Sequence, residues 1–336
     1  MKLSMGIVGL PNVGKSTLFK ALTNNDILVA NYPFATIDPN VGIVPVPDER
    51  LDKLNALSNS KKRIPAIVEF YDIAGLVKGA SAGEGLGNQF LTHIRETNAI
   101  VEVLRCFPSD EIIHVENSVD PARDMDIINA ELALKDLDTV EKNFKKAETE
   151  ARNNVKGARE DLEMFKKAKE ALEQGKMLFA PEFADVRGNE KLKLLNLLTA
   201  KPQLYLLNGT PEHVSPELIK KIKDLGADYV VVDLAGNPDL GGLIKKAYEI
   251  LGLISFFTTG EDESRAWTIR NGAKAPEAAG AIHSDFEKKF IRAEVINWEK
   301  LLEATSWSKA KQKGTLRLEG KDYVVHDGDV MEIRHG

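Results

Sequence analysis

Residues 9–17 read GLPNVGKST, which matches the pattern G-x-x-x-x-G-K-[ST]. Residues 2–8, which precede this stretch, form a short apolar run typical of a strand, and residues 15–22 carry apolar side chains at helical spacing. The two glycines therefore fall in a turn from a strand into a helix. Gly9 and Gly14 let the backbone of such a turn bend around a ligand with no Cβ in its way. The stretch predicts a phosphate-binding loop at the start of an α/β domain.

Each polar group of this loop has its own role in phosphate binding. Backbone N–H groups of the loop can converge on phosphate oxygens, and the N-terminal end of the helix adds partial positive charge. The Lys15 ammonium can reach the β and γ phosphates of a nucleoside triphosphate, and the Ser16 hydroxyl can ligate Mg²⁺. The predicted nucleotide-binding residues of the loop are Asn12, Val13, Gly14, Lys15, Ser16 and Thr17.

The composition is that of a soluble globular protein: 43% of the 336 residues are hydrophobic and 29% are charged, a length that suits two or three domains. Cys106 is the only cysteine, which excludes an intramolecular disulfide framework and favours a reducing cytoplasm. No basic and apolar leader precedes the first strand, and no apolar run approaches the roughly 20 residues that cross a bilayer. We expect a cytoplasmic monomer without a membrane partner. The net charge of −6 means that contact with nucleic acid would need a local basic surface.

A proline-interrupted loop, NYPFAT at residues 31–36, lies between the first helix and an apolar run at 41–46. In nucleotide switches a threonine at this place ligates Mg²⁺ beside the γ-phosphate and releases it after hydrolysis. Thr36 is therefore a predicted metal ligand and catalytic residue. Its alternative role is that of an ordinary threonine in a surface loop.

The apolar run at 66–71 predicts a second buried strand, and it is followed by the D-x-x-G pattern at 72–75. A carboxylate at the end of this strand can hold the water shell of Mg²⁺, so Asp72 is a predicted second-shell metal residue. The Gly75 backbone N–H can face the γ-phosphate. Leu76 stands where Ras-like proteins have the glutamine that orients the attacking water, which predicts slow intrinsic hydrolysis.

A further core strand is predicted at 99–107, and the pattern changes from residue 121 onward. Apolar residues recur there at 3-4 spacing among many Lys and Glu residues, first up to Ala151 and again after Gly157. This pattern predicts two long antiparallel helices that form a coiled-coil hairpin. The local lysine clusters at 142–146 and 166–169 are either solvated helix faces or contacts to nucleic acid.

Two more strands, at 203–207 and 228–234, end in loops where a GTPase reads its base. Guanine selection normally uses N-K-x-D, whose aspartate accepts from both guanine donors. Here Gly209 replaces the lysine that follows Asn208, and Pro211 replaces the aspartate. The missing carboxylate removes strong selection for GTP and opens the pocket to adenine. Asn208 and Gly209 are the predicted base-binding residues.

The chain after residue 254 predicts a small third unit. Strands are expected at 255–258 and 265–270, an amphipathic helix at 278–291, and a hairpin of 322–325 with 330–334 around Asp327 and Gly328. This order of elements suggests a ubiquitin-like β-grasp fold. The unit carries no catalytic constellation, so we interpret it as a binding module.

Taken together, these motifs resemble those of the Obg-related YchF family, also called Obg-like ATPases, along essentially the whole chain. The resemblance implies an ATPase that binds ribosomes and ends in a TGS domain. It also suggests a replacement water-handling group, His114, whose alternative is a partly buried structural histidine. The stretches that carry the resemblance are GLPNVGKST at 9–17, NYPFAT at 31–36, DIAGLVKGAS at 72–81, GEGLGNQF at 83–90, RAWTI at 265–269 and IHSDFEKKFIR at 282–292.

One departure concerns the base-reading loop. The family usually has N-x-x-E, whereas here the glutamate is Glu212, four residues after Asn208. Either the loop is one residue longer or Glu212 has no direct role with the base. If Glu212 looped back to the aspartate position, recognition of guanine would be rebuilt.

The sequence therefore predicts an α/β P-loop NTPase with a mostly parallel sheet, interrupted by a helical hairpin and followed by a β-grasp TGS domain. The expected domains are 1–120 with 200–253, then 121–199, then 254–336. The predicted function is that of an ATP-hydrolysing, Mg²⁺-dependent switch that binds ATP, ADP and the ribosome. The alternatives are an Obg-type GTPase and a constitutive ribosome or RNA adaptor with nucleotide as a structural ligand. The predicted catalytic residues are Lys15, Thr36, Gly75 and His114.

Overall fold

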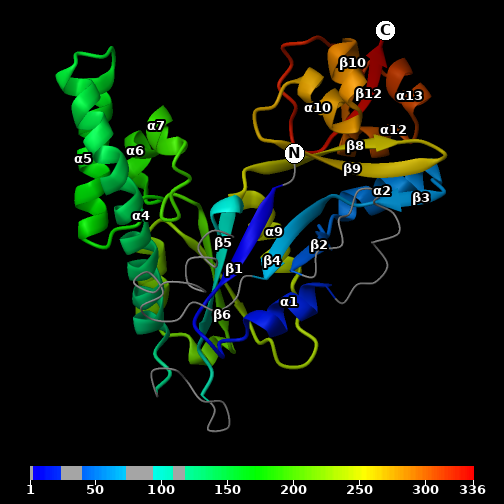
Figure 1. Cartoon of the computed structure of the whole chain (residues 1–336). Helices are drawn as coiled ribbons and strands as arrows, with labels where there is room; N and C mark the ends of the chain where they lie inside the picture. The colour runs from blue at the N-terminus through cyan, green and yellow to red at the C-terminus, as the bar shows by residue number, and fades with distance from the viewer. Residues whose placement is uncertain (1–2, 24–39, 73–93, 109–117) are drawn as a thin grey trace.

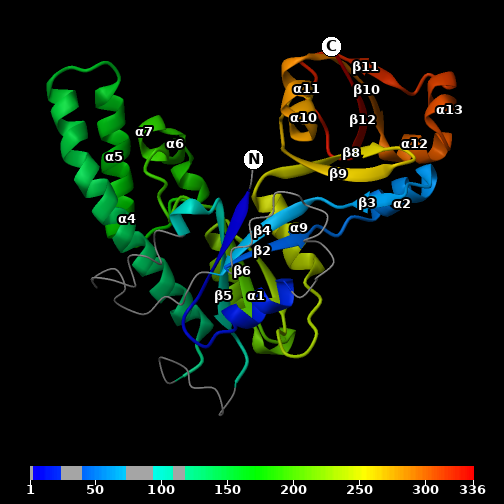
Figure 2. The same cartoon turned by 45° about the vertical axis from the view of Figure 1, so that its right-hand side comes forward.

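The computed structural model describes residues 3–23, 40–72, 94–108 and 118–336. Within them the chain forms two six-stranded sheets and a pair of long helices (Figure 1). The helix pair stands on one side of the first sheet and the second sheet lies on the other (Figures 1 and 2). Three predicted site residues, Thr36, Gly75 and His114, lie outside the described residues, as does Leu76.

The first sheet has the order β2-β4-β1-β5-β6-β7, in which all neighbours are parallel except β2 and β4. Its central strands are predominantly apolar and are buried along their whole length, as is typical of parallel strands covered on both faces. The predicted mostly parallel sheet is confirmed, with strand ends shifted by one or two residues. The strands are β1 Ser4–Val8, β2 Val41–Pro45, β4 Ile67–Asp72, β5 Ala99–Arg105, β6 Gln203–Asn208 and β7 Asp228–Val232.

Helices cover both faces of this sheet, and β6 shows how the faces differ. Leu204 and Leu206 pack in the core that includes residues of α1 and α9, whereas Tyr205 and Leu207 pack with residues of α4 and α8. This alternation follows from the two-residue period of a strand. The helices concerned are α1 Lys15–Thr23, α8 Pro216–Asp224, α9 Gly241–Ile250 and the first turns of α4 Pro121–Arg152.

The predicted long helices are α4 Pro121–Arg152 and α5 Ala158–Glu173, which lie side by side (Figures 1 and 2). Asp120 caps α4 by accepting from the Arg123 N–H at 3.1 Å, and Pro121 occupies the first turn. A separate apolar core runs between the two helices and includes Val140 and Phe165. The coiled-coil geometry of the pair stays a prediction.

The chain between α5 and β6 forms short helices that the sequence pattern did not predict. These elements are η2 Pro181–Phe183, α6 Ala184–Gly188 and α7 Glu190–Lys193. The buried Asp136 carboxylate of α4 accepts from the backbone N–H groups of Leu198 and Thr199 at 2.9 and 2.7 Å. These bonds hold the returning chain against α4.

The second sheet has the order β11-β10-β12-β8-β9-β3. The predicted strands at 255–258 and 265–270 are present as the antiparallel pair β8 and β9. Strand β12 lies between β10, to which it is antiparallel, and β8, to which it is parallel. The strands are β3 Lys62–Ile64, β8 Leu253–Thr259, β9 Glu263–Arg270, β10 Phe290–Asn297, β11 Arg317–Glu319 and β12 Asp329–His335.

The helix predicted at 278–291 is wrong at both ends. The helix α10 spans Ala275–Ile282, a short α11 spans Ser284–Lys288, and residues from Phe290 onward form β10. His283 separates the helices because its backbone is extended, with φ of −159°. The apolar residues that the pattern assigned to one helical face therefore belong to three elements.

The hairpin predicted around Asp327 and Gly328 is also wrong. Within residues 322–325, Val324 makes an isolated bridge to Lys274, and β12 pairs with β10 and β8 instead. The Asp327 carboxylate accepts from the Ser255 N–H of β8 at 2.9 Å, so the Asp-Gly pair contacts a distant strand. Two further helices, α12 Trp298–Ala304 and α13 Trp307–Gln312, connect β10 to β11.

A segment from the nucleotide half of the chain takes part in the second sheet. The helix α2 Glu49–Ser58 and the strand β3 follow β2, and β3 pairs in parallel with β9. The sequence pattern did not indicate this exchange. Among the described residues, no helix is both long enough and apolar enough to span a membrane.

Candidate phosphate-binding site

The loop between β1 and α1 has the backbone conformation that its glycines permit. Gly9 and Gly14 have φ of 157° and 108°, and Asn12 has φ of 63°. A Cβ at Gly9 would lie 2.7 Å from the Val103 carbonyl oxygen of β5, and one at Gly14 would lie 2.6 Å from Nδ2 of Asn208. The glycines are therefore required by the close approach of neighbouring elements, in addition to the access that they give a ligand.

Lys15 begins α1 with its side chain buried at 7% exposure. Its ammonium donates to the Leu10 carbonyl oxygen at 2.7 Å, which folds the side chain across the loop. Burial lowers the pKa of Lys15 to about 8, and the charge of Asp72 opposes this shift. The ammonium is thus held inside the loop by a neutral oxygen, where an anionic ligand would offer a better partner.

Asp72 ends β4, which lies beside β1 in the sheet. Burial raises the pKa of its carboxyl group and the charge of Lys15 lowers it, so the two side chains are electrostatically coupled. The structure therefore brings together the lysine of the first motif and the acid of the second, as the order of strands in a P-loop fold requires.

The polar residues of the loop face outward at the first turn of α1. Asn12, Ser16 and Thr17 are exposed, whereas Val13 is buried in the core beneath the loop. The Ser16 hydroxyl is accessible at the N-terminal end of the helix, the position from which such a group ligates Mg²⁺.

Asn208 connects the phosphate loop to the two loops that the sequence predicts to read the base. The side chain has 3% exposure, its Nδ2 donates to the Val13 carbonyl oxygen at 2.9 Å, and its Oδ1 accepts from the Leu234 N–H at 3.1 Å. Gly209 donates its N–H to the Val232 carbonyl oxygen at 3.0 Å. These bonds fix the relative position of three loops, a role that the sequence pattern did not assign to Asn208.

Glu212 lies one short turn beyond Asn208, in η3 Pro211–His213, and is exposed. A hydrogen bond with the Thr210 side chain lowers the pKa of Glu212. The carboxylate is therefore bonded to its own turn, in which Thr210 and His213 form a capping arrangement.

The residues present fit a bound magnesium nucleotide. The buried Lys15 lacks a charged partner at hydrogen-bond distance among the residues that the structure describes, and the side chains of Ser16 and Asp72 supply oxygen atoms. Across those same residues no group of three or more His, Cys, Asp or Glu side chains could hold a metal ion. Magnesium in such loops is bound by few protein oxygens, with phosphate and water completing its shell.

Two family models match the chain at its two ends. Residues 4–147 match a family described as 50S ribosome-binding GTPase. Residues 253–336 match a family named YchF-GTPase_C and described as a protein of unknown function (DUF933).

Similar proteins match over the full length. The chain is 48% identical over 364 residues to a Bacillus subtilis (strain 168) protein named Ribosome-binding ATPase YchF, with 99% of each chain covered. It is 46% identical over 362 residues to the Escherichia coli O157:H7 protein of the same name, again with 99% of each covered. The solved structure of the Schizosaccharomyces pombe YchF GTPase superposes with a TM-score of 0.88 at 38% identity, covering 99% of this chain and 98% of that one. Similarity of this degree over whole chains confirms the resemblance of the motifs: the protein belongs to the YchF family.

Proposed function

We propose that this protein is an ATP-hydrolysing switch whose nucleotide state changes its affinity for the ribosome. The observation that carries the proposal is the junction of the phosphate loop with a base-reading loop that lacks a carboxylate at the guanine position. The names of the relatives from Bacillus subtilis and Escherichia coli, Ribosome-binding ATPase YchF, support the ATPase activity and the ribosome as a partner.

The loop residues divide the work of binding the nucleotide. Lys15 leaves the Leu10 carbonyl and pairs with the β and γ phosphates, because a charged oxygen is the stronger acceptor. Ser16 and Thr36 would hold Mg²⁺ directly, and Asp72 would hold it through water. The metal, when bound, neutralises charge that develops on the phosphates. Gly75 would donate its N–H to the γ-phosphate.

The preference for ATP follows from the atoms around the base. Guanine presents N1–H and N2–H₂ as donors, and the Asn208-Gly209-Thr210-Pro211 loop has no carboxylate to accept both. The Glu212 carboxylate, which could supply one, is bonded within its own turn. Unpaired guanine donors would cost about 1–3 kcal/mol, so we expect ATP to bind more tightly than GTP by a modest margin.

The attacking water is positioned by a group other than residue 76, because the aliphatic Leu76 cannot hydrogen-bond it. His114 is the candidate that the family resemblance suggests. Hydrolysis is accordingly slow in the free protein, and we infer that a partner accelerates it.

We divide the chain into three domains to account for this function. Residues 1–120 and 200–253 form the nucleotide domain, residues 121–199 a coiled-coil hairpin, and residues 254–336 a β-grasp TGS domain. The hairpin and the TGS domain would provide the surfaces that meet the ribosome. We place the monomeric protein in the cytoplasm, where ribosomes and ATP are available.

A competition titration of ATP against GTP tests the base preference, with wild type compared to Glu212→Ala. Tighter binding of ATP to both proteins is expected. Tighter binding of GTP to wild type that is lost in Glu212→Ala would overturn the ATPase assignment. It would then favour the GTPase alternative, the activity named for the Schizosaccharomyces pombe relative.

Co-sedimentation with ribosomes tests the switch against the adaptor alternative. The full-length protein is loaded with ADP or with a non-hydrolysable ATP analogue, and the bound fraction is measured across a ribosome titration. A difference in affinity between the two states is expected. Equal affinities would contradict the switch, because a ligand without differential affinity shifts no equilibrium.

A further inference from the structure

Residues 46–66 connect two strands of the first sheet, yet they form part of the second. Strands β2 and β4 are antiparallel neighbours, and the Val46 N–H donates to the Ala66 carbonyl oxygen at 2.8 Å, which brings the ends of the segment together. Between these ends, β3 pairs with β9 in the second sheet. We refer to residues 46–66 as the bridging segment. It is covalently continuous with the first sheet and hydrogen-bonded into the second.

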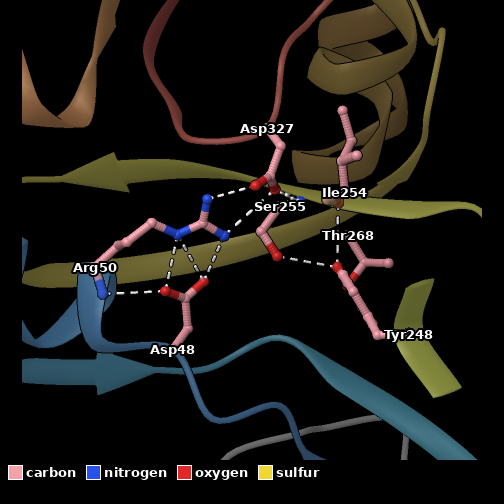
Figure 3. A network of polar contacts seen from close by, with 7 residues as sticks. All are labelled: Asp48, Arg50, Tyr248, Ile254, Ser255, Thr268 and Asp327. Atoms are coloured by element: carbon pink, nitrogen blue, oxygen red, sulfur yellow. Dashed lines mark hydrogen bonds and ion pairs between the residues drawn. The ribbon is translucent and has the colours of Figure 1, made fainter. Parts of the chain in front are cut away.

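Arg50 of the bridging segment binds two carboxylates at once (Figure 3). Its Nε and Nη2 donate to Asp48 at 2.9 and 2.8 Å, and its Nη1 donates to Oδ2 of Asp327 at 2.5 Å. Its guanidinium lies 5.1 Å from the centroid of the Phe257 ring of β8. Although burial opposes the charge, the bonds to Asp48 and Asp327 raise the pKa of Arg50 above its usual value. We call Asp48, Arg50 and Asp327 the arginine clamp.

The clamp converges with a second anchor on Ser255 of β8, which is buried (Figure 3). Asp327 accepts from the Ser255 N–H at 2.9 Å, and the Tyr248 hydroxyl of α9 lies 3.0 Å from the Ser255 hydroxyl. Tyr248 also donates to the Ile254 carbonyl oxygen at 3.1 Å. Helix α9, which packs on the first sheet, and α2 of the bridging segment are therefore both bonded near one point of the second sheet.

The bridging segment leads directly to the phosphate site. Strand β4 leaves it at Ile67 and ends at Asp72, whose carboxyl group is electrostatically coupled to Lys15. Strand β4 also pairs with β1, in which Ile7 lies opposite Asp72. The Asp72 end of β4 is thus connected to β8 through one short strand, the bridging segment and the arginine clamp.

We propose that the arginine clamp couples the nucleotide site to the second sheet, so that ATP and ADP give that sheet different stabilities. This inference rests on the proposed switch function and names its mechanical connection. Arg50 is a positioning residue in this scheme, since its side chain bonds to Asp48 and Asp327 and acts on the second sheet through them. Coupling requires an element whose equilibrium both sites bias. In this proposal that element is the bridging segment, which is continuous with β2 and β4 and is bonded to the second sheet through the arginine clamp.

Hydrogen exchange on the full-length protein tests the coupling. Wild type and Arg50→Ala are saturated with ADP or with a non-hydrolysable ATP analogue, and exchange is followed in peptides covering β8 and β9. In wild type we expect the exchange rates of the two states to differ by about fivefold. In Arg50→Ala this ratio falls toward one while nucleotide affinity stays within about twofold of wild type, because Arg50 is not part of the phosphate site.

Lys61→Ala is the matched control. Lys61 also joins the bridging segment to the second sheet, through an ion pair with Asp262 at 2.9 Å, but these side chains are 75% and 90% exposed. An exposed pair contributes little rigidity, so the wild-type ratio should persist. Asp327→Asn keeps an acceptor for the Ser255 N–H and weakens the bond to Arg50, so it should lower the ratio even if Arg50→Ala unfolds.

Two results would overturn the inference. One is an Arg50→Ala or Asp327→Asn protein that retains the full nucleotide-dependent difference in β8 and β9. The other is a wild-type protein in which these strands exchange at equal rates in the two nucleotide states, although its ribosome affinity differs between them. That result would contradict the coupling and leave the proposed function intact. Ribosome affinity that is equal in both states instead contradicts the proposed function, while the exchange ratio still reports on the coupling.

Discussion

Lys15 is a buried cation and Arg50 a partly buried one, both in the nucleotide half of the chain, and their surroundings differ. Lys15 donates to a neutral carbonyl oxygen and has Asp72 as a more distant charge, so burial dominates and lowers its pKa to about 8. Arg50 binds two carboxylates directly, and its pKa is raised. The first cation gains a partner when an anion arrives, whereas the second is already satisfied. Counter-ions therefore distinguish Lys15, the proposed ligand-binding residue, from Arg50, whose partners belong to the protein itself.

The largest effect is expected for Lys15→Ala. This change should lower the rate of ATP hydrolysis by about 10²–10³-fold, because it removes a positive charge aimed at the transferred phosphate. The melting temperature should not fall, since the lost ammonium is buried without a directly bonded carboxylate. Phosphate release and thermal unfolding measure the two quantities.

Lys20→Ala provides the control for this substitution. Lys20 lies on the same helix and is exposed, so hydrolysis should stay at the wild-type rate. Near-wild-type hydrolysis by Lys15→Ala would mean that Lys15, like Arg50, has a structural role, and would contradict the proposed difference between the two cations.

Arg50→Ala should show the opposite pattern. We expect a loss of about 2 kcal/mol in the free energy of unfolding, because Asp48 and Asp327 lose charge-assisted hydrogen bonds. The loss is modest because Arg50 and Asp327 are partly exposed and solvent screens their interaction. Urea unfolding measures the loss, and nucleotide titration should give an affinity close to that of wild type. A large loss of affinity would mean that Arg50 belongs to the nucleotide site.

A smaller effect should appear in the pH dependence of nucleotide binding. In the free folded protein Lys15 loses its proton near pH 8, whereas phosphates favour the charged form and raise its pKa. Above about pH 8, binding should therefore take up a proton, and affinity should fall by up to about tenfold per pH unit. Calorimetry in buffers of different ionisation enthalpy measures the uptake. Proton uptake that persists in Lys15→Ala would assign it to another group.

The same lowered pKa sets the sign of the effect of Lys15 on stability. The folded pKa of Lys15, about 8, lies below its ordinary value of 10.5, so the unfolded chain binds more protons between these two values. The contribution of Lys15 to the free energy of unfolding should therefore rise with pH across this window and be constant below it. Comparing the pH dependence of unfolding of wild type and Lys15→Ala isolates this contribution.

The smallest effect is expected for Lys61→Ala. The ion pair with Asp262 joins the same two parts as Arg50 does, but solvent screens it, and its loss should cost less than about 0.5 kcal/mol. Urea unfolding should place this variant within error of wild type. A cost equal to that of Arg50→Ala would show that burial and the number of carboxylates do not explain the difference between the two cations.

The first sheet was more predictable than the second for a physical reason. Each of its central strands is predominantly apolar and buried along its whole length, as in Ser4–Val8, and the phosphate loop follows that strand directly. In the second sheet, β3 has two exposed basic residues, Lys62 and Arg63, and is only three residues long, so its pattern does not indicate a strand. Strand β12 is placed between β10 and β8 by pairings that span the whole unit.

The candidate site shows the same division. The glycines and Lys15 were recognisable because spacing within nine residues defines the motif. That Gly14 must lack a Cβ because of Asn208 depends on a contact across nearly two hundred positions of the chain. Only part of the arginine clamp could have been found in the sequence. Asp48 precedes a run with Leu51 and Leu54 at helical spacing, where a helix cap is expected, but the bond of its carboxylate to the Arg50 side chain is not a property of caps.

The sequence by itself determined the phosphate loop, the positions of the buried strands along the chain, the long helices and the absence of a guanine-reading carboxylate. Each of these features depends on residues close together in the chain. The tertiary structure alone decided that Lys15 is buried against Leu10, that Asn208 joins three loops and that residues 46–66 belong to both sheets. Burial and counter-ions arise from elements brought together from distant positions. Burial lowers the pKa of Lys15 and folding gives Arg50 two carboxylate partners, and neither effect can be read from a local pattern of residues.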